Sequence, residues 1–216
     1  MTRKSNSLLV LFCALVSFAV VESSFAYEPG DPEAGQGKAA LCGGCHGMDG
    51  NSPDATFPRL AGQYAGYIVK QVRDFQSGKR ANNDTMAGMA ATVASVQDAK
   101  DIGAYFAQQK MADDPLVKPD RKLVEKGKKI FHQGNEKTGL YACVNCHGER
   151  GKGKAPDISV FPRIGGQHRD YIKKELHDFQ AGTRSNDPAG MMSDIAKKLS
   201  DDEINAVAAY LSTLLP

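Results

Sequence analysis

An internal repeat constrains this chain more than any other feature. The segment 57–63, FPRLAGQ, recurs as FPRIGGQ at 161–167, and the segment 74–80, DFQSGKR, recurs as DFQAGTR at 178–184. In both cases the second copy follows the first by the same interval, which places the two halves in a common alignment. A repeat of this length predicts two copies of one ancestral domain. We therefore expect domains at 27–115 and 116–216, joined by a linker around 112–119.

Both copies have the sequence pattern of helices. Apolar residues recur three or four positions apart in the segments 64–76 and 168–180, and glycine follows each segment, as is usual after a helix end. Further helices are predicted at 33–41, at 121–131, at about 95–110, and from the capping box that begins at Ser200. No long segment alternates apolar and polar residues as a half-buried strand does. The predicted fold class is all-α, with two tandem domains.

The N-terminus has the three parts of a secretory signal peptide. Arg3 and Lys4 form a positive start, the segment 8–21 is apolar, and Ser24-Phe25-Ala26 provides small residues at the positions that a signal peptidase reads. The apolar run is shorter than the roughly 20 residues of a membrane-spanning helix. We expect cleavage after about Ala26 and export to the periplasm.

Charge is unevenly divided between the two expected domains. Residues 27–115 hold 8 basic and 11 acidic side chains, a net charge of −3, whereas residues 116–216 hold 17 basic and 13 acidic side chains, a net charge of +4. Such asymmetry can orient a docking protein, but these charges are too few and too mixed to predict a nucleic-acid partner. The chain also lacks tryptophan, so each small domain needs additional apolar mass in its core.

A covalently attached haem would supply that mass, and each half contains the attachment motif Cys-x-x-Cys-His. The residues are Cys42, Cys45 and His46 in the first half, and Cys143, Cys146 and His147 in the second. In this motif the thiols form thioethers with the haem vinyl groups, and the histidine is the proximal iron ligand. The sequence therefore predicts two haem c groups.

Three other interpretations of the cysteines are weaker. A redox-active Cys-x-x-Cys belongs to an α/β fold, two such pairs can form a four-cysteine zinc site, and cysteines of exported proteins can form disulfides. None of these explains a histidine directly after both pairs of a duplicated, exported chain.

Methionines are the candidates for the second axial ligand. Met86 and Met89 follow the first motif at a suitable distance, and Met191 and Met192 follow the second. A methionine opposite histidine raises the reduction potential and fills the last coordination position of the iron. This favours electron transfer over catalysis at an open iron. The alternative role of any methionine is core packing, and only one of each pair can reach the iron.

Other repeated residues are candidates for supporting roles. A ligand histidine usually donates its second ring N–H to a carbonyl, and the carbonyls of Pro58 and Pro162 are the expected acceptors. Guanidinium groups match carboxylates, so the haem propionates are candidate partners for the repeated bases Arg59, Arg80, Arg163 and Arg184, for which ordinary surface charge is the alternative. We expect the unrepeated histidines, His132, His168 and His177, to be exposed.

Taken together, the motifs resemble the dihaem cytochrome c4 family, in which two class I cytochrome c domains lie in tandem. The resemblance covers essentially the whole chain after the signal peptide. It implies an all-α fold, domains packed about a pseudo-twofold axis with the haem propionates near the interface, and Met86 and Met192 as the second ligands. Met89 remains an alternative, because the last helix of the first half begins one residue later than the family spacing predicts.

The resemblance also implies a function. Family members are periplasmic electron carriers, some of them attached to the membrane surface, that deliver electrons to a terminal oxidase or a similar acceptor. We accordingly expect redox proteins as partners and no enzymatic activity. The alternative is a cytochrome subunit of a redox enzyme complex, such as a flavin-dependent sulfide dehydrogenase, which tandem domains of this kind also resemble.

Overall fold

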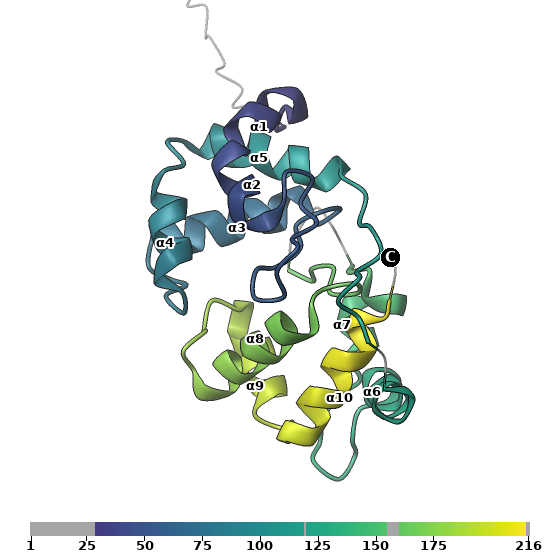
Figure 1. Cartoon of the computed structure of the whole chain (residues 1–216). Coiled ribbons are helices and arrows are strands. Elements are labelled where there is room, and N and C mark those ends of the chain that lie inside the picture. The colour runs from purple at the N-terminus through teal and green to yellow at the C-terminus, as the bar shows by residue number, and fades with distance from the viewer. Residues whose placement is uncertain (1–28, 119, 155–159, 215–216) are drawn as a thin grey trace, which may run out of the picture.

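The computed structural model describes residues 29–118, 120–154 and 160–214. Its helices form two groups, one above the other in Figure 1. The first group consists of α1 (Pro32–Lys38), α2 (Ala40–His46), α3 (Ala65–Gln76), α4 (Asp84–Ala91) and α5 (Val96–Gln108). The second consists of α6 (Arg121–Gln133), α7 (Val144–His147), η1 (Glu149–Gly151), α8 (Arg169–Ala181), η3 (Pro188–Gly190), α9 (Met191–Ala196) and α10 (Asp201–Ser212).

The all-α prediction is confirmed for this part of the chain. Its only β-type pairings are two isolated bridges, Asn135 with Leu140 and Lys154 with Phe161. None of the described helices is both long and apolar enough to cross a bilayer. The predicted signal peptide, residues 1–26, lies outside the described residues.

The first and last helices of each group cross at a glycine. A Cβ atom on Gly35 of α1 would lie 2.0 Å from the carbonyl oxygen of Asp101 on α5. A Cβ atom on Gly127 of α6 would lie 1.9 Å from the carbonyl oxygen of Ala206 on α10. Both distances are far below van der Waals contact, so the two backbones can approach this closely only where a side chain is absent.

Each group encloses its own apolar core. The first core is built from Ala39, Ile68, Val72, Phe75, Ala90, Ala99, Ile102 and Phe106. The second is built from Ile130, Phe131, Leu140, Ile172, Leu176, Leu199, Ile204, Ala206, Val207, Ala208, Tyr210 and Leu211. Burial of such side chains is the main source of stability for each group.

Helix ends follow the local signals in the sequence. Asp31 caps α1 by accepting hydrogen bonds from the backbone N–H groups of Glu33 and Ala34. The predicted capping box of Ser200 and Glu203 is present at the start of α10. Gly182 ends α8 with φ +78°, a left-handed conformation that glycine adopts without strain.

Two local expectations were incomplete. The helix predicted at 33–41 is divided into α1 and α2 at Ala39, which is the C-cap of one helix and the N-cap of the other. The methionine-bearing helices α4 and α9 were not predicted. They are 8 and 6 residues long, too short for an apolar period to be recognised in the sequence.

The two groups are joined by glutamines of the repeated FPR-x-x-GQ segment. Gln63 donates its side-chain N–H to the carbonyl of Arg163 at 2.8 Å and accepts from that residue's backbone N–H at 3.1 Å. Gln167 makes the same pair of bonds with Arg59, at 3.0 and 2.8 Å. Each copy of the segment therefore binds the backbone of the other copy, which explains why the two copies have nearly the same sequence.

Candidate haem sites

The cysteines and histidines of the two motifs lie on short helices. Cys42, Cys45 and His46 are on α2, while Cys143 is the N-cap of α7, which carries Cys146 and His147. None of the four motif cysteines forms a disulfide, so their sulfur atoms are available for attachment to haem. In the described part of the chain, no three or more His, Cys, Asp or Glu side chains form a group that could hold a metal ion. The two pairs therefore do not form a shared zinc site.

The imidazole rings of both motif histidines are oriented by proline carbonyls. Nδ1 of His46 lies 2.8 Å from the Pro58 oxygen, and Nδ1 of His147 lies 3.0 Å from the Pro162 oxygen. A carbonyl can only accept, so Nδ1 carries the proton in both rings and Nε2 keeps its lone pair. The predicted role of the two prolines is confirmed, and each ring is left with the nitrogen that an iron ligand needs.

Burial shifts the pKa values of the motif histidines and of two motif cysteines. It lowers the pKa of His46 and His147, against the opposing effect of the proline carbonyls, and so favours the neutral imidazole that binds a metal. Burial also raises the pKa of the Cys42 thiol, and it raises that of Cys143 to about 11. A redox-active cysteine needs a stabilised thiolate, so these thiols do not resemble those of a disulfide oxidoreductase.

The candidate methionines lie on α4 and α9, at the edges of the two cores. Met86 packs against the first core and Met192 against the second. Burial does not distinguish Met86 from Met89, since both are half-buried, whereas Met191 is 38% exposed and Met192 is half-buried. Packing at a core edge fits a side chain that completes an apolar haem pocket, and the assignment of the ligands stays a prediction.

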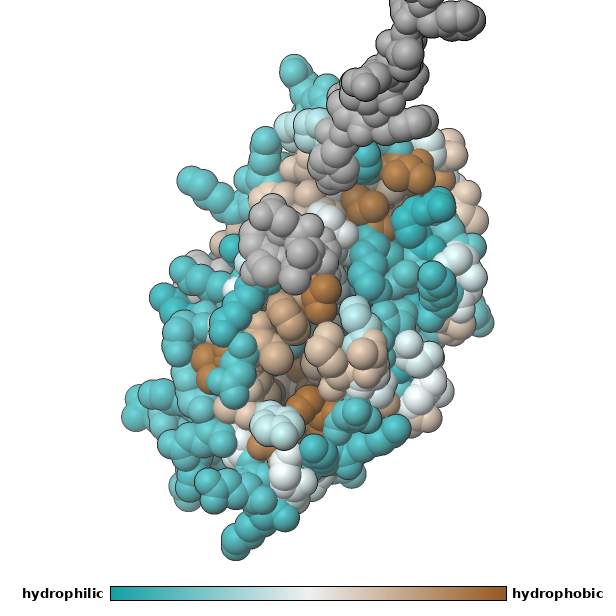
Figure 2. Space-filling model, turned by 180° about the vertical axis from the view of Figure 1, so that it is seen from behind, coloured by the Kyte–Doolittle hydropathy of each residue, from teal (hydrophilic) through white to brown (hydrophobic). Residues whose placement is uncertain are grey.

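The surface of the second group has an apolar hollow of the kind that a haem requires. In Figure 2, which views the molecule from behind, brown and tan side chains surround a hollow in the lower half, the half formed by the second group of helices. Free thiols, a histidine with an available Nε2 and apolar surroundings together fit a covalently held haem.

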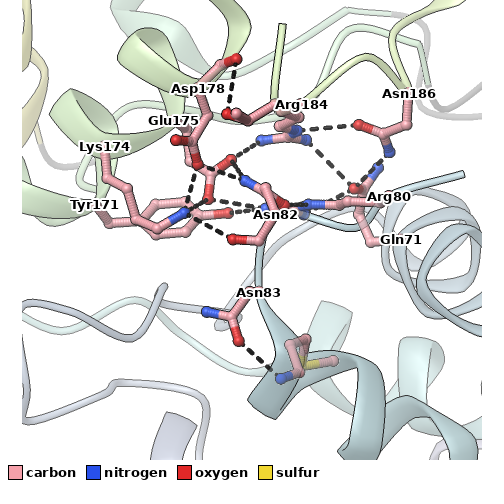
Figure 3. A network of polar contacts seen from close by, with 12 residues as sticks. Gln71, Arg80, Asn82, Asn83, Tyr171, Lys174, Glu175, Asp178, Arg184 and Asn186 are labelled. Carbon is pink, nitrogen blue, oxygen red and sulfur yellow. Dashed lines mark hydrogen bonds and ion pairs between the residues drawn. The ribbon is translucent and has the colours of Figure 1, made fainter. Parts of the chain in front are cut away.

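The repeated arginines bind protein groups at the junction between the two helix groups. Arg80 donates to the Tyr171 hydroxyl at 3.3 Å, and Arg184 donates to the Tyr67 hydroxyl at 3.1 Å. Both guanidiniums also form ion pairs with Glu175, at 2.9 and 2.7 Å. Figure 3 shows Arg80, Arg184 and Glu175 converging at the junction. Arg59 is buried and donates to the Gly166 carbonyl at 2.9 Å.

The junction is nearly symmetric in its polar contacts. Asn186 donates to Asp74, and Asn82 donates to Asp178, in both cases at 2.6 Å. Lys174 binds the carboxylate of Asp178 at 2.5 Å, and Lys70 binds that of Asp74. In Figure 3 the Asn82 and Asn186 side chains both lie within this network. Sequence reasoning did not predict the contacts of Asn186 and Asn82, because each joins residues about one repeat length apart.

One expectation about the unrepeated histidines was wrong. His168 is only 1% exposed, because it lies where the linker, the second group and a loop of the first group meet. His132 and His177 are closer to the expectation, with side chains that are 30% and 43% exposed.

Comparison with known proteins agrees with this geometry. The sequence model of the cytochrome c family, described as "Cytochrome c", matches residues 124–215. A cytochrome c4 of Pseudomonas aeruginosa is 45% identical over 193 residues, which are 89% of this chain and 92% of that protein. A thiosulfate dehydrogenase electron acceptor of Thiomonas intermedia is 32% identical and spans 92% of this chain and 89% of that protein.

A solved structure gives the same result for the fold. The crystal structure of reduced recombinant cytochrome c4 from Pseudomonas stutzeri superposes with a TM-score of 0.78 at 42% identity, covering 86% of this chain and 99% of that one. Identity at this level over nearly the whole length, together with two Cys-x-x-Cys-His helices in an all-α fold, leads to one conclusion. The chain belongs to the cytochrome c4 family of dihaem c-type cytochromes, which carry electrons.

Proposed function

We propose that this protein carries electrons in the periplasm and delivers them to a membrane acceptor such as a terminal oxidase. The proposal places one haem in each half, with residues 27–115 and 116–216 as the two domains. Cys42 and Cys45 would hold the first haem between His46 and Met86. Cys143 and Cys146 would hold the second between His147 and Met192.

The observation that carries the proposal is the duplicated histidine geometry. In both halves a proline carbonyl fixes Nδ1–H and directs Nε2 away from it. Bound haem supplies an iron that accepts and releases one electron. The protein holds the ligand ring in one orientation and one tautomer, so the change of oxidation state needs little rearrangement of the chain. A methionine at the sixth position would exclude water and small substrates, and this favours a carrier over an enzyme.

The ligand assignment can be tested by absorption spectroscopy of the oxidised protein. The weak far-red band from methionine to ferric iron should have the intensity of two methionine-ligated haems. The variants Met86→Ala and Met192→Ala should each lose about half of that intensity, because each removes one of two ligands. Met89→Ala and Met191→Ala are the matched controls and should retain the full band. Loss of the band in a control instead would move the ligand to that neighbour, and high-spin haem in the unmodified protein would contradict the carrier function.

A second candidate function is electron acceptance within an enzyme system. The relative from Thiomonas intermedia, described as a thiosulfate dehydrogenase electron acceptor, favours a donor that oxidises sulfur compounds. Mixing the oxidised protein with a thiosulfate-oxidising enzyme and an excess of thiosulfate should then reduce both haems rapidly, because oxidation of thiosulfate supplies the two electrons. Reduction no faster than that of an unrelated cytochrome would reject this donor, and delivery of electrons to an oxidase would remain the proposed function.

A further inference from the structure

The second half has an ordered turn before its haem motif that the first half lacks. The crossing glycine precedes the first motif cysteine by 7 positions in the first half and by 16 positions in the second. The additional residues form a turn that is closed by two backbone hydrogen bonds of 2.9 Å between Asn135 and Leu140. The Asn135 amide donates to Glu203 of α10 at 2.8 Å and so holds the turn against the second group of helices. Tyr141 follows the turn directly, two positions before Cys143.

Two lysines bind the backbone beside and within this motif. Lys198 donates to the Gly139 carbonyl at 3.0 Å, and its ammonium lies 5.2 Å from the centre of the Tyr141 ring. Lys154 donates to the carbonyl of Asn145, which lies between the two motif cysteines, at 2.7 Å. An ammonium has three donors, and a backbone carbonyl has no net charge. Each contact therefore fixes the position of a positive charge without neutralising it.

The same region exposes an aromatic ring and a motif cysteine. Tyr141 is 71% exposed, and Cys146 is the only one of the four motif cysteines that is exposed. Two further lysines are exposed nearby in the sequence, Lys137 in the turn before the motif and Lys152 in the loop after it. The four lysines form what we call the basic rim: Lys137, Lys152, Lys154 and Lys198.

The surroundings of the first motif are apolar and nearly uncharged. Leu41 and Met48, on either side of that motif, are 63% and 57% exposed. Lys38 is also near the motif, but two aspartates of α5 bind its ammonium. The loop 47–53, GMDGNSP, has one acidic and no basic residue, whereas the corresponding loop 148–154, GERGKGK, has three basic residues and one acidic residue. A positive rim is therefore a property of the second motif.

We propose that the basic rim and Tyr141 form a docking surface through which the second haem exchanges electrons with a redox protein that is acidic around its own redox centre. Aromatic side chains are enriched in protein interfaces, and charges at the rim of an interface set the rate and orientation of association. The net charges of the two halves, −3 and +4, turn the second half toward such a partner. The assignment rests on the proposed carrier function.

The fixed lysines favour a protein over a membrane as the occupant. An anionic lipid surface attracts lysines wherever they are exposed, because the attraction follows the number of charges near the surface. Lys154 and Lys198 are instead held in place by the backbone around the motif, beside the exposed Cys146 to which the haem would be attached. Charges in defined positions around a redox centre fit a partner of defined shape.

The test uses the holoprotein and two small copper proteins as probes, one acidic and one basic around the copper. Calorimetric titration measures complex formation, and stopped-flow spectroscopy measures electron transfer from the reduced protein to the oxidised copper. The double variant Lys152→Gln/Lys154→Gln removes two charges from the basic rim. The matched control is Lys79→Gln/Lys110→Gln, which removes two exposed charges from the first half and gives the same net charge.

We expect the acidic probe to bind and the basic probe not to bind. At an ionic strength of about 0.01 M the rim variant should associate with the acidic probe about tenfold more slowly than the unmodified protein, and the control should associate at nearly the unmodified rate. The difference should become small at about 1 M, where charges are screened beyond about 3 Å. Tyr141→Ser should weaken the complex about tenfold at every ionic strength, because it removes an aromatic contact at the centre of the surface.

Equal effects of the two double variants, whether large or absent, would overturn the proposal, since the position of the lysines would then not matter. Vesicles of phosphatidylcholine, with and without phosphatidylglycerol, test the alternative occupant. Binding to the anionic vesicles that is lost in the rim variant, together with no binding of the acidic copper protein, would assign the rim to a membrane surface and reject a protein partner. Failure of the carrier function would appear separately, as high-spin haem in the absorption spectrum with calorimetric binding intact.

Discussion

The helix crossings of the two halves have the same backbone arrangement but differ in the side chains beside them. At both crossings a glycine, Gly35 or Gly127, allows a carbonyl of the last helix to approach. One turn further along α1, Lys38 binds the carboxylates of Asp98 and Asp101. The position aligned with Lys38 in α6 is Ile130, which is buried in the second core, and the position aligned with Asp101 in α10 is Ala206.

The difference indicates which part of the crossing is indispensable. Close approach of two backbones depends on the absence of a side chain, and both halves meet that requirement in the same way. The neighbouring positions are less constrained, because either an ion pair or apolar packing can fill them. At these positions the first half therefore uses an ion pair, and the second half uses apolar packing.

The junction between the halves contains a similar departure from symmetry. Glu175 of α8 lies between Arg80 and Arg184, and the aligned position on α3 is Gln71. Gln71 accepts hydrogen bonds from the same two arginines, at 2.8 and 3.3 Å. A single carboxylate therefore neutralises two buried guanidiniums. Burial by itself raises the pKa of Glu175, but Arg184 and Arg80 outweigh it and hold that pKa below its ordinary value.

The largest expected effect comes from removing that carboxylate. Glu175→Gln keeps the shape of the side chain but leaves Arg80 and Arg184 without an anionic partner, and loss of one member of a buried ion pair costs about 3 kcal/mol or more. Denaturant unfolding of the holoprotein measures the change in the free energy of unfolding. Gln71→Glu is the matched control, since it adds a second carboxylate beside the same arginines and should cost much less. Equal effects of the two substitutions would show that the junction does not depend on where its negative charge lies.

The next effect concerns the glycines of the crossings. Gly35→Ala and Gly127→Ala would each place a methyl group against a carbonyl oxygen, and overpacking of this kind costs about 2 kcal/mol or more. Gly37 is in the same helix as Gly35, but a Cβ atom there would meet nothing within 4 Å. Gly37→Ala should therefore be neutral or stabilising by up to about 1 kcal/mol. Unfolding midpoints of the three variants provide the comparison, and an equal loss at Gly37 would contradict the role of close approach.

The sequence predicted the features that are local or repeated. Cys-x-x-Cys-His identified the two haem motifs, and the adjacent Phe-Pro-Arg segment correctly predicted the carbonyls of Pro58 and Pro162 as partners of the histidines. The capping box at Ser200 and the positive φ at Gly182 were likewise predictable, because each is determined by residues within a few positions of one another.

Features that join the two halves were not predictable. The repetition of Gln63 and Gln167 indicated a shared role, but the bonds that these residues form across the junction depend on how the two halves are placed. Arg80 and Arg184 were candidates for binding propionates, and a guanidinium binds the Glu175 carboxylate by the same chemistry. His168 was expected at the surface, because nothing near it in the sequence indicates that Asp114 and Ser52 lie against it.

The smallest expected effect is a difference in acid stability between the two crossings. Hydrogen bonds from Lys38 and from the backbone N–H of Asp31 lower the pKa of Asp101 from 3.8 to about 2. The folded-state pKa is below the unfolded one, so the stabilisation is fully present above about pH 4 and is lost as pH falls toward 2. Ala206 provides no such group in the second half, so the crossing of α1 and α5 should weaken first. Hydrogen exchange of the α1 and α5 amides, compared with those of α6 and α10 during acid titration, measures the difference. Asp101→Asn should lower stability at neutral pH and thereby remove this acid dependence. If the amides of α1 and α5 lose protection no earlier than those of α6 and α10, the ion pair is not what distinguishes the two crossings.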